Sequence, residues 1–218
     1  MKSQTEKTGS LEIVQVERGK DFAEKTGQAP SQKRDREEDW QINLNAVVQA
    51  SRGGDWPAAL KALTYLSTKE WHPDANKALA QRIWLTLKSD ASISEVVLAL
   101  NLAFVRFSPL HERAGLVAAL ANFMAARRGV GEADGELAQM QAMGMVKALR
   151  EARNLSDEPA FIAWMQENRL EDPDYFIPEA MEMLETMVDG QWWLNREKLQ
   201  QEMEIANQAT LSGVEPVN

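Results

Sequence analysis

The chain of 218 residues contains no cysteine. The protein therefore has no disulfide, no thiolate zinc site and no cysteine nucleophile. This composition fits a reducing compartment, and we expect a cytoplasmic protein. Histidine is scarce as well, since His72 and His111 are the only two. Neither belongs to an HExxH motif or to a Glu-x-x-His pair of the kind that binds metals in helical bundles.

Long apolar runs are also missing. Residues 1–19 lack the apolar region of a secretory signal peptide. The most apolar run, residues 93–107, contains Glu95, Asn101 and Arg106 and is too short to cross a bilayer unaided. A run of this length is typical of a buried core helix. We therefore predict neither a signal peptide nor insertion into a membrane.

The common catalytic and nucleotide-binding motifs do not occur. The sequence has no GxSxG, no Walker loop and no GxGxxG, and the glycines of residues 127–136 have neither a lysine nor a preceding strand. Both histidines lie at predicted helix starts. We predict a protein that is not an enzyme and needs no cofactor. A small helical enzyme or metal protein is the second alternative, because catalytic residues that are distant in sequence can meet in a fold.

Charge is distributed unevenly along the chain. The net charge is −1 over residues 1–39, +4 over residues 40–130 and −12 over residues 131–218. An acidic C-terminal third repels nucleic-acid phosphates and anionic lipids and attracts basic surfaces. The predicted partner is therefore another protein with a basic surface, and direct binding of nucleic acid is not expected.

What the sequence does contain is a succession of helix signals. Apolar residues recur at helical spacing from Trp40 onward, and no alternating segment of strand length follows. Asp55 is placed to cap a helix that has Pro57 in its first turn. Ser92 and Glu95 form a capping-box pattern. These signals predict an all-α fold with about nine helices in an irregular bundle of helical hairpins.

The same signals divide the chain into three parts. We predict a single helical domain over residues 39–209 and a flexible tail over residues 210–218. Residues 1–38 are rich in Lys, Glu, Gln, Ser and Thr and predict a flexible polar arm. Within that arm, residues 11–16 (LEIVQV) are apolar and β-branched. They form either a short strand that pairs with a partner's sheet or an apolar patch in a flexible terminus.

One hairpin carries a family pattern. Residues 54–56 (GDW) occupy a turn between two predicted helices, Ala59 takes a small-residue position in the second helix, and Leu63 takes a large apolar one. Residues 44–67 thereby resemble a tetratricopeptide-like helical hairpin, which implies a role in binding proteins. Val47 departs from the small residue expected in the first helix. The pattern does not recur at a fixed period, so we predict hairpins with repeat-like features instead of a regular array.

The C-terminal third supplies the candidate binding residues. Glu182, Glu185 and Asp189 are spaced to share one helix face, which is either solvated or a docking face for a basic partner. The spacing does not match an EF-hand calcium loop. Eight of the ten methionines lie between residues 140 and 203. Methionines pack in cores or line adaptable grooves.

Two adjacent tryptophans complete the candidate site. We expect them on the C-terminal helix, one buried and the other on the rim of an interface, where tryptophan is enriched. Replacing the rim tryptophan with alanine should then weaken association more than stability. The predicted partner-binding residues are Trp192, Trp193, Met183, Met187, Glu182, Glu185 and Asp189.

These features favour a non-enzymatic protein–protein interaction module, such as an adaptor, a chaperone or an assembly factor. The alternative is an acidic inhibitor or immunity-type protein that blocks a basic or nucleic-acid-binding partner. The two differ in their response to salt. Mimicry of nucleic-acid charge weakens steeply as salt screens it, whereas binding in a groove persists.

Deleting residues 1–36 tests the predicted arm. We expect the melting temperature to stay nearly unchanged, because this segment has too few apolar residues to contribute to a core. Thermal unfolding of the full and shortened chains, followed by circular dichroism, makes the comparison. A large drop in melting temperature would show that the arm belongs to the fold.

Overall fold

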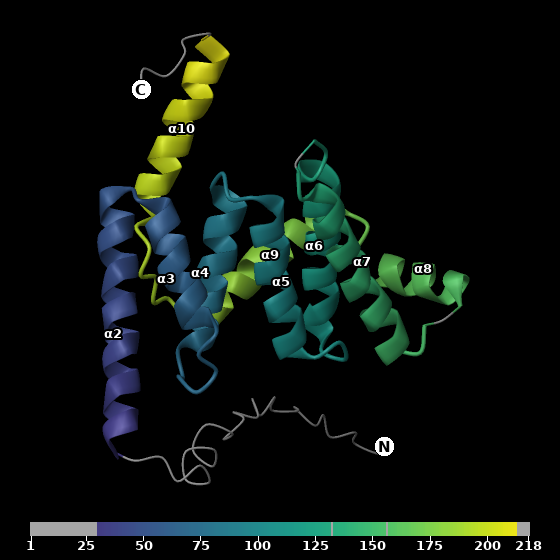
Figure 1. The fold of residues 1–218 in the computed structure, drawn as a ribbon. Helices are drawn as coiled ribbons and strands as arrows, with labels where there is room; N and C mark the ends of the chain where they lie inside the picture. The colour runs from purple at the N-terminus through teal and green to yellow at the C-terminus, as the bar shows by residue number, and fades with distance from the viewer. Residues whose placement is uncertain (1–29, 132, 156, 213–218) are drawn as a thin grey trace, which may run out of the picture.

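The protein is all-helical throughout the part of the chain that the structure describes (Figure 1). This structure is a computed structural model, and it describes residues 30–131, 133–155 and 157–212. These ranges contain nine α-helices and no strand, which confirms the predicted fold class. The helices are α2 (Pro30–Gly53), α3 (Trp56–Ser67), α4 (Ala75–Lys88), α5 (Ile93–Phe107), α6 (Glu112–Arg128), α7 (Gly135–Ala152), α8 (Glu158–Glu167), α9 (Pro173–Val188) and α10 (Arg196–Ser212).

Helices extend past both ends of the predicted domain. Helix α2 begins at Pro30, inside the segment predicted as an arm, and α10 continues to Ser212, past residue 209. Every described side chain of α2 before Trp40 is exposed, so this part of the helix has no apolar face from which a period could be recognised. Residues 1–29, which include the LEIVQV segment, and residues 213–218 lie outside the described part.

Local signals were right for some helix starts and wrong for others. The Asp55 carboxylate accepts the Ala58 N–H at 3.0 Å, and Ser92 Oγ accepts the Glu95 N–H at 3.3 Å, as predicted for caps. In contrast, Pro178 by itself predicts that the helix of residues 173–188, α9, is regular only from this proline, because proline favours the first turn of a helix. It begins at Pro173, where Asp172 caps the first turn, and it accommodates Pro178 in its interior.

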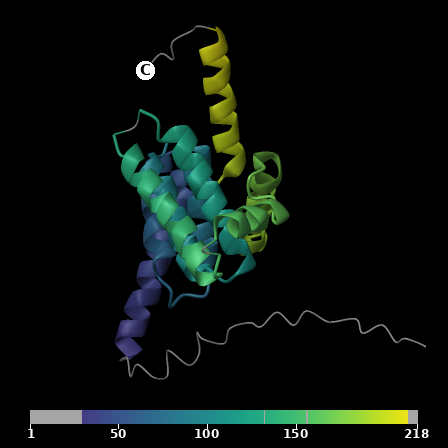
Figure 2. The same ribbon diagram turned by 90° about the vertical axis from the view of Figure 1, so that its right-hand side faces the viewer.

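The helices from α2 to α7 form a row in which each helix packs against the next (Figure 1). Helix α5 also packs against α7, and α9 lies across α4 and α6. One side of α9 is buried against this row, while α10 rises from the body (Figure 2). Within the described ranges, no helix is both long enough and apolar enough to cross a membrane. The buried residues of α9 are Phe176, Ala180, Met183, Leu184 and Val188.

Three arginines at equivalent positions connect the helices of this row. Arg106, Arg128 and Arg153 lie at the C-terminal ends of α5, α6 and α7. Each guanidinium donates to backbone carbonyls at the connection between the two preceding helices, and we call these interactions the arginine latches. The acceptors are the carbonyls of Ser67 and Ala75 for Arg106, of Thr86 and Ala91 for Arg128, and of Leu110 and His111 for Arg153.

The latches supply hydrogen-bond donors to backbone carbonyl groups at the connections of helical hairpins. The last carbonyl groups of a helix have no partner within the helix. The latch acceptors at Ser67 and Thr86 are of this kind, whereas those at Ala75 and His111 lie at the starts of α4 and α6. A guanidinium carries several donors in one plane and can satisfy two carbonyls at once. Burial lowers the pKa of Arg106, and the nearby Glu70 carboxylate partly offsets this effect. The latches therefore fix the position of each connection relative to the helix two places later.

Replacing Arg128 with methionine tests a latch. This change keeps most of the side-chain stem but removes the donors to two carbonyls, so we expect a loss of about 1–3 kcal/mol in the free energy of unfolding. Urea unfolding of the variant gives the value. Arg52→Met is the matched control, because Arg52 also lies in the last turn of a helix but is exposed. Equal effects of the two changes would contradict the latch.

Candidate functional site

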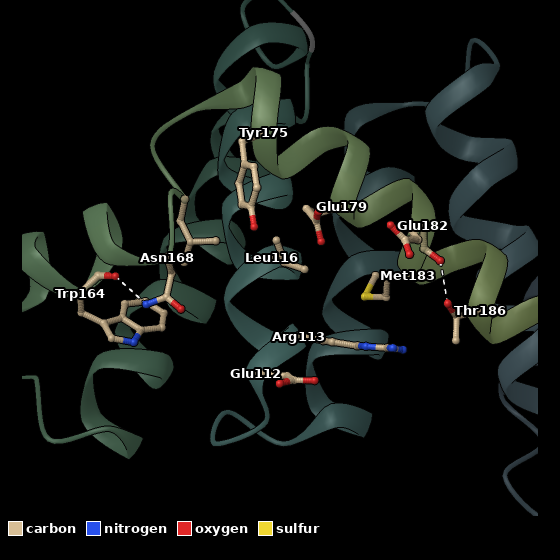
Figure 3. A pocket seen from close by; sticks show the side chains of 11 residues that line it. Glu112, Arg113, Leu116, Trp164, Asn168, Tyr175, Glu179, Glu182, Met183 and Thr186 are labelled. Carbon is tan, nitrogen blue, oxygen red and sulfur yellow. Dashed lines mark hydrogen bonds between the residues drawn. The ribbon is translucent and has the colours of Figure 1, made fainter. Parts of the chain in front are cut away.

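A cavity of about 340 Å³ lies between the start of α6, helix α8 and helix α9 (Figure 3). It contains two residues of the predicted binding set, Glu182 and Met183. Its other lining residues come from segments far apart in the sequence. The full lining consists of Glu112, Arg113, Leu116, Trp164, Asn168, Leu170, Tyr175, Glu179, Glu182, Met183 and Thr186.

Helix geometry brings the polar side chains together. On α9, Tyr175, Glu179 and Glu182 are spaced by four and three residues, so they share one helix face. Figure 3 shows this face above the first turn of α6, with α8 at the side. Two polar groups of the lining are already bonded: Asn168 Nδ2 donates to a backbone carbonyl of α8 at 2.8 Å, and Thr186 Oγ1 donates to the Glu182 carbonyl at 2.9 Å.

The cavity carries an excess of negative charge. Three carboxylates (Glu112, Glu179 and Glu182) and one guanidinium (Arg113) line it. Among the residues that the structure describes, no cation lies within 4.0 Å of these three carboxylates, although six other carboxylates pair with a lysine or an arginine. With Arg113 counted, the lining keeps a net charge of −2, and its carboxylates are not paired within the described part of the chain. No set of three or more potential metal ligands gathers in the described part of the chain.

The aromatic walls of the cavity are held by other arginines. Arg153 lies 4.9 Å from the ring centroid of Trp164, and Arg169 lies 4.1 Å from that of Tyr175. These are cation–π distances. Asp172 in turn holds Arg169 through an ion pair of 2.8 Å. Each of the two aromatic walls is thus in contact with an arginine.

The rest of the predicted acidic face lies elsewhere. Glu185 accepts a bond from the Trp192 indole at 2.9 Å and pairs with Arg196 at 2.7 Å, so its charge is compensated. Asp189 is exposed and ends α9 in a left-handed conformation, with φ of 53°. Met187 is half-buried against the core. The structure therefore separates these three residues from the cavity.

The tryptophan pair does not lie on a helix, which corrects the prediction. Trp192 and Trp193 belong to the connection between α9 and α10, and both are half-buried. Their rings pack edge-on against Trp84 and Trp40, at centroid distances of 5.5 and 6.3 Å. The buried Gln81 Oε1 accepts the Trp193 N–H at 2.7 Å. Since both rings contact the core, replacing either is expected to reduce stability.

The two histidines do not meet. The His72 ring stacks on Trp40 at 3.5 Å, its Nδ1 accepts the Asp74 N–H at 3.1 Å, and its Nε2 lies 3.8 Å from Glu37. Burial lowers the pKa of His72, and the Glu37 and Asp74 carboxylates partly oppose this effect. His111, in contrast, is exposed and caps α6.

A second hollow of about 760 Å³ lies between α3, the connection from α4 to α5, and α10. It is larger than the cavity beside α9, but its lining does not indicate one kind of ligand. Its lining includes Lys61 and Lys88 as well as Asp90, Glu95 and Glu202, so both signs of charge are present. The smaller, acid-lined cavity is the stronger candidate site.

Sequence reasoning missed most of the cavity. Glu179 belongs to the carboxylate-rich stretch, but Glu112, Arg113, Trp164 and Tyr175 gave no signal, because nothing local indicates that their helices meet. Searches of family models, curated proteins and solved structures gave no significant match to this chain. Its function therefore has to be inferred from the geometry.

The lowered pKa of His72 predicts how stability depends on pH. The folded state binds a proton at His72 less readily than the unfolded state, for which the ordinary pKa is 6.5. This contribution to stability is complete above the ordinary pKa and is lost as the pH falls through it toward the lowered value.

Urea unfolding of the wild type and of His72→Gln, at about pH 7 and about pH 5, measures the effect. We expect the wild type to lose more stability on acidification than His72→Gln does. His111→Gln serves as the control and should lose as much as the wild type. The same loss in all three proteins would show that His72 does not contribute.

Proposed function

We propose that this protein is a non-enzymatic interaction module that binds a basic segment of another protein in the acid-lined cavity between α6, α8 and α9. One observation carries the proposal: Glu112, Glu179 and Glu182 line the cavity and have no cationic partner among the described residues. An arginine or lysine side chain of the partner would supply the missing positive charge.

The shape of the site supports a side chain as the ligand. A cavity of about 340 Å³ is at the small end of the range for ligand pockets and holds one or two long side chains. Leu116, Leu170 and Met183 provide apolar contacts for the stem of such a side chain, while the carboxylates bind its charged end. The lining holds no histidine, serine or lysine, and the Thr186 hydroxyl is already bonded.

The charge of the surrounding chain supports the same partner. Residues 131–218 carry a net charge of −12 and contribute most of the cavity. Such a field attracts a basic partner and speeds the encounter, while the contacts inside the cavity determine how long the complex lasts. Adaptor, chaperone and assembly factor are the roles that fit this mode of binding, and a cytoplasmic location remains part of the proposal.

Removing two of the carboxylates tests the proposal. We expect Glu179→Gln combined with Glu182→Gln to weaken binding of a fluorescently labelled arginine- and lysine-rich peptide by about tenfold or more, because two charge-assisted contacts are lost. Fluorescence anisotropy measures the affinity. Glu171→Gln with Glu204→Gln is the matched control, since it removes two exposed charges outside the cavity.

Three outcomes are informative. Loss of affinity in the cavity variant alone supports the proposed site. Unchanged affinity in that variant contradicts it. Equal loss in both variants, together with a steep dependence on salt, would show that the general acidic field binds the peptide, as expected for an inhibitor that mimics nucleic-acid charge.

A further inference from the structure

Helix α7 exposes a stripe of residues on the side opposite its core contacts. Its buried residues are spaced at helical intervals and define the inner side. Glu136, Met140, Met143 and Lys147 lie on the opposite side, at intervals of four, three and four residues. Met140 is 70% exposed and Met143 is 59% exposed. We call these four residues the α7 stripe. The inner side consists of Ala138, Ala142, Met145 and Leu149.

The position of α7 makes this exposure unusual. It is the last helix of the row that starts at α2, and its extensive contacts are with α5 and α6. End helices of stacked helical hairpins normally have a polar outer face. The outer face of α2 is of this kind, since it presents Asn45, Gln49 and Arg52 beside Ile42, the one large apolar side chain that is exposed among its described residues. The α7 end, in contrast, exposes Leu137, Met140 and Met143.

We propose that this chain forms a two-fold symmetric dimer in which α7 packs antiparallel against α7 of a second copy. With the symmetry axis between Gln141 and Ala142, each Met140 lies opposite Met143 of the other copy. In the same register, each Glu136 lies opposite Lys147 of the other copy. The intervals of four and three residues are those of a helix–helix seam with apolar contacts at its centre.

Charge identifies the second copy as the occupant of this face. The antiparallel arrangement forms two equivalent pairs between Glu136 and Lys147. A parallel arrangement would place like charges opposite each other, which disfavours it. Stacking of α7 on α2 of another copy would place the methionines against Asn45 and Gln49. The self-complementary face thus favours a closed dimer over an open chain of molecules.

Gly144 gives independent support. A Cβ atom at this position would have no neighbour within 4 Å, so nothing in the described part of the fold explains a glycine there. Glycine inside a helix destabilises it relative to alanine. Gly144 lies next to the stripe, where the absence of a side chain allows a second helix to come close.

The contact is small, because it involves one helix from each copy. We therefore expect weak association that depends on protein concentration. A dimer would also place two acid-lined cavities in one particle. A partner with two basic segments would then bind more tightly than a partner with one.

Sedimentation velocity of the full chain over a dilution series tests the dimer. We expect wild-type protein to dimerise as its concentration rises, and Met140→Glu combined with Met143→Glu to remain monomeric. Ile42→Glu is the matched control, because it places the same charge at an exposed apolar position on α2, and it should dimerise like the wild type. Far-ultraviolet circular dichroism checks that each variant is folded.

A charge exchange tests the register. Glu136→Lys alone and Lys147→Glu alone should each raise the dimer dissociation constant by about tenfold, because each places like charges opposite one another. The two changes together should restore dimerisation. The ion pair of Lys147 with Glu151 in the same helix, at 3.8 Å, is exposed at both side chains and contributes little.

Several results would overturn the proposal. Wild-type protein that stays monomeric at the highest attainable concentration excludes the dimer. A dimer that persists in the methionine variant uses another surface. A double charge exchange that dimerises no better than the single changes excludes the antiparallel register.

Discussion

Carbonyl groups at helix ends need hydrogen-bond donors, and the rest of this structure depends on how that need is met. The arginine latches supply donors from Arg106, Arg128 and Arg153 to connections that lie two helices earlier. A connection bound in this way cannot move independently of the later helix. The latches thereby connect the helices from α3 to α7, and this row packs against α9, which contributes Glu179 and Glu182 to the cavity.

The carboxylates on α9 follow one helical spacing but differ in whether a cation pairs with them. Glu185 faces Trp192 and Arg196, and its charge is compensated within the molecule. Glu179 and Glu182 face a cavity and have no cation among the described residues. The difference arises from the connection that follows α9, which Gln81 holds against α4 through the Trp193 N–H. The carboxylates of this helix are thus paired within the molecule at one end and line the cavity further along.

The two proposed surfaces have different chemistry and can be tested separately. The cavity between α6, α8 and α9 is lined by carboxylates and suits a positively charged side chain. The α7 stripe has two exposed methionines between opposite charges and suits its own copy. A dimer formed through α7 would present two cavities to one partner, so self-association would raise the affinity for repeated basic segments without any new contact.

The sequence by itself determined the helical class and many helix boundaries, because helical spacing and caps such as Asp55 and Ser92 act within a few residues. It did not reveal the start of α2 at Pro30 or the connection that holds Trp192, because solvent exposure leaves no apolar period and tertiary contacts override local helix preference. Only the tertiary structure decided which methionines face inward: Met145 packs in the core, whereas Met140 on the same helix is exposed. The tertiary structure also places Glu112 and Glu179 in one cavity. The packing of α9 across the row is a long-range interaction that no local sequence pattern encodes.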